Sequence, residues 1–243
     1  MHRFFIGEDQ IINGNEACIT GSDADHAKKV LRLREDDAVI ILDGKGMEYP
    51  GRIITLDGKV LRVALGAPSA CAAEPSVEAT LFQCLPKAGK MDLIIQKTVE
   101  LGISRIVPVL SHRCVARPEA GDMKKRVTRY QRIAYEAAKQ CGRGIIPKVN
   151  DAVKLEEASE KGAGLLIFAD EEEKDTSLKR RLRGAQSPEK VSFLIGPEGG
   201  LAREEAKLLA LAGWHPVTLG KRILRTETAP IALLAMLMYE LEG

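Results

Sequence analysis

The stretch that decides the fold is Val191-Ser-Phe-Leu-Ile195, followed directly by Gly196-Pro-Glu-Gly-Gly200. A short apolar run of buried-strand type enters a glycine-rich loop, and a helical pattern begins at Ala202. In α/β sheets, ligands bind beyond the carboxyl ends of the strands, and glycine lets the backbone approach them closely. The motif therefore predicts a ligand-binding loop, and a plain strand-to-helix turn is the alternative.

The composition of this loop narrows the class of ligand. It is neither a dinucleotide fingerprint nor a phosphate-binding loop, because no Gly-Lys-Ser/Thr follows it. Pro197 also removes one backbone donor, which makes the loop a poor cradle for phosphate. Backbone recognition of an uncharged adenine edge suits it better. A nucleotide-dependent oxidoreductase is disfavoured, since the acidic partner expected about 20 residues after a dinucleotide fingerprint is also missing.

Outward from the loop, strand-like and helical patterns alternate from residue 77 to the C-terminus. This alternation predicts an α/β fold with a parallel sheet covered by helices on both faces. The expected strands are 77–84, 105–109, 165–169, 191–195 and 216–219, and the expected helices are 90–101, 122–141, 202–212 and 227–241. The acidic run at 171–175 is interpreted as a solvated turn.

The N-terminal part has a different pattern, typical of a small β-barrel with one helix. Turn signals such as Asp43-Gly44 separate its short apolar runs. Strands are expected at 4–6, 38–42, 51–56 and 60–65, and a helix at 23–33 with Ser22 as its N-cap. Residues 66–75 are expected to be a linker. The predicted domains are 1–70 and 74–243.

A second loop of interest is Leu219-Gly-Lys-Arg-Ile-Leu-Arg-Thr-Glu-Thr-Ala229, which also follows a strand and precedes a helix. Thr226 or Thr228 could cap that helix. Arg225 and Glu227 would lie at the carboxyl edge of the sheet, beside the 196–200 loop if the two strands are neighbours. The alternative is a charged helix start with a local Arg–Glu pair.

The net charge of +2 conceals an uneven distribution. Residues 73–149 contain 14 Lys and Arg against 7 Asp and Glu, whereas the flanking parts are slightly acidic. Such a basic middle is typical of a surface for a polyanion, and solvated helix faces are an equal alternative. Much of the positive charge lies in the helices expected at 90–101 and 122–141.

Several classes of protein find no support. The five cysteines form no C-x-x-C pair, and we interpret them as isolated thiols. The four histidines lack metal-ligand spacing, so no metal site is expected, and no serine lies in a G-x-S-x-G elbow. We expect His26 and His112 to have surface or structural roles. We expect neither a membrane span nor a signal peptide. We expect a cytoplasmic location.

Four motifs together resemble the ribosomal RNA small subunit methyltransferase E family over essentially the whole chain: LIGPEGG, LGKRILRTETA, K-x-x-x-MDLIIQKTVELG and EAAKQCGR. The segment HAKKVLRLR (26–34) also resembles the H-x-x-x-VLR motif in the PUA-like barrel of that family. The resemblance implies methylation of N3 of a uridine in 16S rRNA with S-adenosyl-L-methionine (SAM). It further implies a SPOUT-type catalytic domain with a C-terminal trefoil knot, a homodimer, and the 30S subunit or a late precursor as partner.

The resemblance also implies site residues. The cofactor would contact Leu194, Ile195, Gly196, Pro197, Gly199, Gly200, Leu219, Gly220, Arg222, Ile223, Leu224 and Thr226. Uridine N3 is protonated at neutral pH, so we expect Arg225 to stabilise the developing uracil anion. Glu198 or Glu227 would hold Arg225 or act as the base.

The RNA would lie across the barrel and the basic middle of the chain. Its expected contacts are Arg3, His26, Lys29, Arg32, Arg34, Lys87, Lys97, Arg113, Arg129, Arg132 and Arg143. The chain departs from the family pattern at Ser111-His112-Arg113, where many relatives carry Glu-Arg, so we assign no role to an acid there. The rival hypothesis is a non-catalytic RNA-binding protein that retains the fold.

Overall fold

The computed structural model describes residues 1–57, 59–87, 89–185 and 188–242, which form two compact units. The small unit contains Met1–Glu74 and Ala138–Ile146. The large unit contains Pro75–Ala137 and Pro147–Gly243. The small unit thus includes a segment that lies far from the N-terminus in the sequence.

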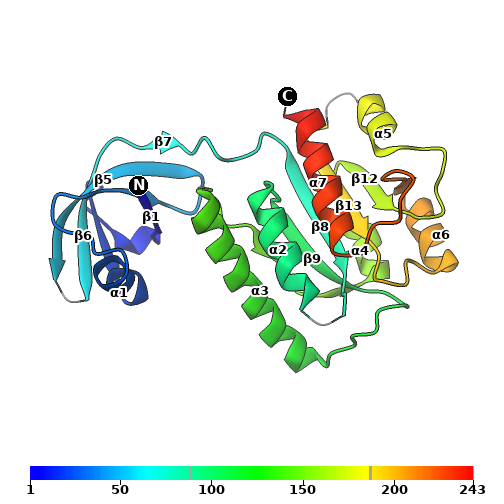
Figure 1. Ribbon diagram of the computed structural model, residues 1–243, viewed down its shortest axis with the longest axis horizontal. Helices are drawn as coiled ribbons and strands as arrows, with labels where there is room; N and C mark the ends of the chain where they lie inside the picture. Colours follow the sequence, from blue (N-terminus) through cyan, green and yellow to red (C-terminus); the bar gives the residue numbers. More distant parts are fainter. Residues whose placement is uncertain (58, 88, 186–187, 243) are drawn as a thin grey trace. The chain divides into compact units, whose positions relative to one another are not determined.

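The small unit is a twisted, mainly antiparallel sheet with one helix (Figure 1). The strand order is β1-β4-β5-β6-β3-β2, β7 pairs with β5, and β1 and β4 are parallel. Its elements are β1 (His2–Phe5), the 3-10 helix η1 (Glu8–Gln10), β2 (Ile11–Ile12), β3 (Glu16–Thr20), α1 (Ser22–Lys29), β4 (Ala38–Leu42), β5 (Met47–Asp57), β6 (Val60–Leu65) and β7 (Ser69–Ala70). Alternating side chains such as Phe4, Ile41 and Val63 form its apolar core.

Three expectations for this unit were wrong. Helix α1 ends at Lys29 rather than at residue 33, because Arg32 has a φ of 54°, which no helix accommodates. Ser22 is the first helical residue and not the N-cap; Gly21 takes that position without a side-chain hydrogen bond. Strand β3 was not predicted, although it pairs with β6 over its whole length.

Residues 66–75 are also more than a linker, since β7 pairs with β5 and Glu74 binds the segment after α3 (Ala120–Cys141). The Glu74 carboxylate accepts hydrogen bonds from Arg143 Nη2 at 2.7 Å, Gly144 N at 2.7 Å and Ile145 N at 2.9 Å. A partly buried carboxylate with one cation and two backbone donors is well satisfied. Glu74 therefore fixes residues 143–145 within the small unit.

The large unit contains a fully parallel sheet in the order β10-β9-β8-β13-β12-β14, with β11 also paired to β9 (Figure 1). Its strands are β8 (Glu78–Cys84), β9 (Arg105–Leu110), β10 (Lys148–Val149), β11 (Val153–Lys154), β12 (Leu165–Ala169), β13 (Lys190–Ile195) and β14 (His215–Val217). Its helices are α2 (Lys90–Glu100), α3, α4 (Leu155–Lys161), α5 (Leu178–Gly184), α6 (Arg203–Leu211) and α7 (Thr228–Leu241). The predicted α/β class with a parallel sheet is confirmed. The trefoil knot stays a prediction.

The central strands β8 and β13 are buried over most of their length because both faces of the sheet are covered. Phe82 and Phe193 are buried, and Phe82 meets Trp214 edge to face with ring centroids 5.4 Å apart. Helices α2 and α5 pack against α7, whereas α4 packs against α6. None of the helices described is both long and apolar enough to cross a membrane.

Candidate active site

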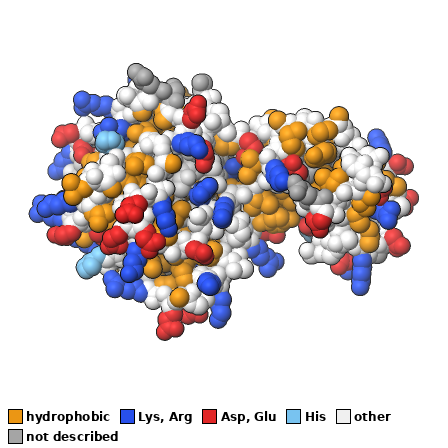
Figure 2. All heavy atoms as spheres, turned by 180° about the vertical axis from the view of Figure 1, so that it is seen from behind, with side chains coloured by type: hydrophobic (Ala, Val, Ile, Leu, Met, Phe, Trp, Pro, Cys, Tyr) orange, Lys and Arg blue, Asp and Glu red, His pale blue; other side chains and the backbone are white. Residues whose placement is uncertain are grey.

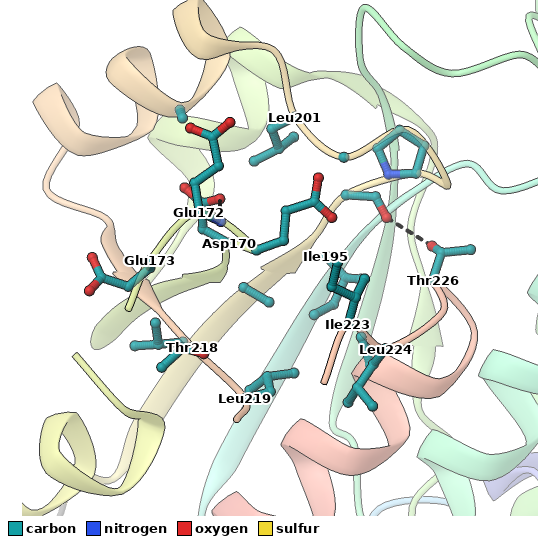
Figure 3. A pocket seen from close by; sticks show the side chains of 18 of the residues that line it. Asp170, Glu172, Glu173, Ile195, Leu201, Thr218, Leu219, Ile223, Leu224 and Thr226 are labelled. Carbon is teal, nitrogen blue, oxygen red and sulfur yellow. Dashed lines mark hydrogen bonds between the residues drawn. The ribbon is translucent and has the colours of Figure 1, made fainter. Parts of the chain in front are cut away.

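A single cavity of about 980 Å³ lies at the carboxyl ends of β12, β13 and β14 (Figure 3). Its walls come from the segments that follow these strands, at 169–174, 195–203 and 217–229. The two loops that the sequence singled out, 196–200 and 219–225, thus meet in one site. Strand β12 lies between β13 and β14, so all three segments leave the same edge of the sheet.

The two loops are joined by a hydrogen bond. Thr226 Oγ1 donates to the carbonyl oxygen of Gly196 at 2.8 Å (Figure 3), and Gln83 Nε2 donates to Thr226 Oγ1 at 3.3 Å. The sequence suggested Thr226 or Thr228 as the cap of α7, but neither residue caps it. The N-cap residue is Glu227, whose side chain makes no capping hydrogen bond. Thr226 instead uses its hydroxyl group to fasten the start of α7 to the 196–200 loop.

The glycines of the 196–200 loop are required by its tight course. Gly200 has a φ of +68°, and a Cβ there would lie 3.1 Å from Glu171 Oε1. A Cβ on Gly196 would lie 3.3 Å from the carbonyl carbon of Gly200. The backbone folds back on itself here, which leaves its polar groups at the cavity wall.

Most of the predicted cofactor residues line the cavity. Those at its wall are Ile195, Gly196, Pro197, Gly200, Leu219, Gly220, Arg222, Ile223, Leu224 and Thr226. Two of the predicted cofactor residues do not line the cavity among the residues that the structure describes. Leu194 is fully buried in β13, and Gly199 directs its carbonyl oxygen to Arg113 Nη1 at 2.7 Å.

The cavity has two chemically different sides (Figure 3). Ile195, Ile223 and Leu224 form an apolar side, whereas Asp170 and Glu172 bring carboxylates from the segment after β12. The acidic run at 171–175 was interpreted as a solvated turn, but its residues 171–174 line the cavity. The sequence of an acidic run alone does not indicate whether its side chains face bulk solvent or a cavity.

Two of the three predicted catalytic residues, Glu198 and Arg225, line the cavity together with Lys90, and the third, Glu227, contacts Lys90. Lys90 Nζ, at the first residue of α2, is 3.0 Å from Glu198 Oε1 and 3.0 Å from Glu227 Oε2. Burial acts to raise the pKa of Glu198, but hydrogen bonds from Lys90 and from the backbone outweigh it and the pKa is lowered. The pKa of Glu227 is lowered chiefly by Lys90, with a smaller effect from Arg225.

A third segment reaches the cavity from β9. Arg113 lines the wall, and the backbone N–H of His112 donates to Glu205 Oε1 at 2.6 Å. Glu205 also accepts from Ala202 N at 2.8 Å, at the start of α6. These contacts fix residues 112–113 beside the 196–200 loop and give His112 a structural backbone role.

Two of the five free cysteines are not isolated as had been expected, because Cys84 and Cys114 interact with each other. Ser111 Oγ also lies 3.2 Å from Cys114 Sγ. The hydrogen bond from the Cys84 thiol lowers the pKa of Cys114 to about 6, and the same contact with burial raises that of Cys84. Both cysteines are buried and lie outside the cavity lining.

The predicted RNA contacts differ in how available they are. Arg32, Arg34, Lys87, Arg113 and Arg132 are exposed, and His26 is half-buried. The others are held in ion pairs: Arg3 with Glu48, Lys29 with Asp25, Lys97 with Glu100, Arg129 with Asp92 and Arg143 with Glu74. The side chain of Arg143 is only 4% exposed, so it is no longer a candidate. On the face in Figure 2, basic and acidic side chains are intermixed.

Comparison with known proteins identifies the family. Residues 73–238 match the RNA methyltransferase domain, and residues 19–65 match the RNA methyltransferase PUA domain. The ribosomal RNA small subunit methyltransferase E of Synechocystis is 30% identical over 100% of this chain and 78% of its own length. The chain belongs to the ribosomal RNA small subunit methyltransferase E family.

Other members of the methyltransferase E family agree with this assignment. The Bacillus subtilis protein is 29% identical over 100% of this chain and 98% of its own. The crystal structure of the Neisseria gonorrhoeae enzyme, bound to S-adenosyl methionine, superimposes with a TM-score of 0.87 at 30% identity, covering 99% and 98% of the two chains. Within the part of the chain described, no group of His, Cys, Asp or Glu is placed to hold a metal ion.

Proposed function

We propose that this protein transfers a methyl group from SAM to N3 of a uridine in 16S rRNA. The observation that carries the proposal is the cavity shared by the 196–200 and 219–225 loops at the carboxyl edge of the sheet. Two glycine- and arginine-bearing loops alone could serve other roles, but their meeting at one cavity that Glu198 and Arg225 also line fits transfer chemistry.

The residues at the cavity fit SAM. Ile195, Ile223 and Leu224 offer an apolar side for a flat adenine ring, and the folded-back loop at 196–200 offers backbone groups for its edge. The carboxylates of the 170–173 segment suit the positive charges of the cofactor. A volume of about 980 Å³ lies at the upper end of the range for small-molecule sites, which leaves room for a target base.

In the reaction the N3 proton of uridine is released to solvent and a methyl group takes its place. SAM would supply that methyl group from its sulfonium centre and leave as the neutral thioether S-adenosylhomocysteine. Arg225 is exposed at the cavity wall and can donate charge-assisted hydrogen bonds to the uracil oxygens as negative charge develops. Its backbone carbonyl accepts the N–H groups of Thr228 and Ala229, which fixes the position of Arg225 at the start of α7.

The small unit is proposed to hold the RNA, in keeping with its match to the RNA methyltransferase PUA domain. Arg32 and Arg34 are its exposed candidates, and Lys87 and Arg132 those of the large unit. The substrate is proposed to be the 30S subunit or a late precursor in the cytoplasm.

We also propose a homodimer formed through α7. This helix is apolar nearly all round, yet Tyr239 is 84% exposed and Met236 is 39% exposed. Leu93, on the neighbouring helix α2, is 43% exposed. Apolar side chains clustered on one face of a soluble protein are typical of a protein–protein contact.

Two measurements test the proposed function. Calorimetry with SAM tests the cofactor site, and mass-spectrometric mapping of 16S rRNA from cells lacking the protein tests the target. We expect saturable SAM binding and the loss of one N3-methyluridine. A protein that bound rRNA but not SAM would support the rival hypothesis of a non-catalytic RNA-binding protein.

A further inference from the structure

Lys90 occupies a position that neither the motifs nor the comparisons assign. It is the first residue of α2, and its ammonium group lies between two carboxylates at 3.0 Å each. Glu198 comes from the loop after β13, and Glu227 is the N-cap residue of α7. One cation therefore contacts both loops that enclose the cavity.

The turn before α2 reinforces this contact. Glu198 Oε1 also accepts a hydrogen bond from the backbone N–H of Lys87 at 3.0 Å. Gly89 takes a left-handed φ of 72° at the N-cap, which directs the chain into the helix with Lys90 next to the loops. The 196–200 loop is thus attached to the backbone N–H of Lys87 and to the charged side chain of Lys90.

Partial burial distinguishes this cluster from an ordinary surface ion pair. The side chains of Lys90, Glu198 and Glu227 are 31%, 26% and 16% exposed. Fully exposed ion pairs contribute little because water screens them, whereas partly desolvated networks are coupled more strongly. The hydrogen bonds that the Lys90 ammonium donates to Glu198 and Glu227 raise the pKa of Lys90, so it stays charged throughout the neutral range.

Charged groups of both signs meet at this wall. Lys90, Arg113 and Arg225 are positive and Glu198 is negative, and Glu227 joins the cluster through Lys90. Among the described residues no carboxylate forms an ion pair with Arg225, because the two nearby acids are already engaged with Lys90. Without Lys90, Glu227 would be left with Arg225 as its nearest counterion.

We propose that Lys90 is a positioning residue that joins the 196–200 loop to the start of α7 and keeps Arg225 available to the substrate. Glu198 and Glu227 are then the anchors of Lys90 and not the general base. This inference rests on the proposed function, since it concerns the same cavity. Under this proposal, Glu198 and Glu227 maintain the shape of the site.

The test compares full-length Lys90→Gln and Lys90→Arg with the wild type, using calorimetry with SAM and single-turnover methyl transfer. Lys161→Gln is the control, because Lys161 also forms an ion pair, with Glu157, but on the exposed surface of α4. Thermal unfolding shows whether each variant is folded.

We expect Lys90→Gln to weaken SAM binding about tenfold, the usual effect of losing hydrogen bonds to charged groups. Lys90→Arg, which can still bridge two carboxylates, is expected to restore most of the affinity and the transfer rate. Adding Glu198→Gln to Lys90→Gln should cost little more, since the two residues act through one contact.

Three results would overturn the inference. The first is a Lys90→Gln variant that binds SAM and transfers methyl groups like the wild type. The second is additive losses in the double variant. The third is a Glu198→Gln or Glu227→Gln variant that abolishes transfer while SAM affinity is unchanged, because that result identifies a base. If the wild type binds no SAM, the proposed function fails as well.

Discussion

Arg225 is the residue on which the proposed chemistry depends most directly. Its guanidinium is exposed at the cavity, and in the described part of the chain no acid forms an ion pair with it. We expect Arg225→Ala to lower the methyl-transfer rate by about 100-fold or more, as for loss of one group that stabilises an anionic transition state. SAM affinity should change little. Single-turnover kinetics and calorimetry measure the two separately, and an unchanged transfer rate would remove Arg225 from the mechanism.

Thr226 shows how one hydroxyl group can join two loops. Replacing it with Val keeps the shape but leaves the Gly196 carbonyl and Gln83 Nε2 without this partner. We expect a loss of about 1–3 kcal/mol in the free energy of unfolding, because buried polar groups become unsatisfied. Thr226→Ser, which retains the hydroxyl group, is the control. Chemical denaturation measures both, and equal stability of Val and Ser variants would contradict the expectation.

At the scale of elements, the parallel strands could be predicted because they are short, continuous apolar runs between helical patterns. Helices α4 and α5 could not, since both are short and highly charged, and only packing stabilises such helices. Helix α1 was extended too far because Leu31 and Leu33 continue an apolar pattern beyond the last helical residue, Lys29. The contacts of Lys90 and Glu74 were missed because their partners are distant in the sequence.

The connection between α4 and β12 depends on one glycine. Gly164 has a φ of +72°, and a Cβ there would overlap the backbone carbonyl of Lys190. We expect Gly164→Ala to lower the free energy of unfolding by about 2 kcal/mol or more through strain and displaced backbone. Gly184→Ala is the matched control, because that position is open and has no positive φ. The midpoints of denaturant unfolding are measured for both variants. Equal midpoints would contradict the expectation, because they would show that the backbone at Gly164 adjusts without cost.

For the whole molecule, the exposed face of α7 predicts the oligomeric state. Tyr239→Glu should convert a dimer into monomers, since burying an unpaired carboxylate is strongly unfavourable. Leu211→Glu is the control, because Leu211 is 91% exposed on α6, in the other group of helices. Sedimentation velocity distinguishes the species. A monomeric wild type at high concentration, or a dimeric Tyr239→Glu variant, would contradict the proposed interface.

The binding of RNA is also a property of the whole molecule. Affinity should fall steeply with salt, in proportion to the phosphates contacted. Arg132→Gln, at an exposed position, should reduce that salt dependence, whereas Arg143→Gln should destabilise the small unit by breaking the pair with Glu74. Filter binding across a salt series and thermal unfolding measure these effects. A salt-independent affinity would argue against phosphate contacts.

The anchoring of residues 143–145 by Glu74 has a consequence for how this chain could be divided. The polypeptide passes between the two units three times, after Glu74, after Ala137 and after Ile146. A fragment ending at residue 74 would therefore lack a structural piece of its own unit and expose a carboxylate that has lost its donors. Transplanting the small unit onto another protein would therefore require two separate pieces of chain, 1–74 and 138–146.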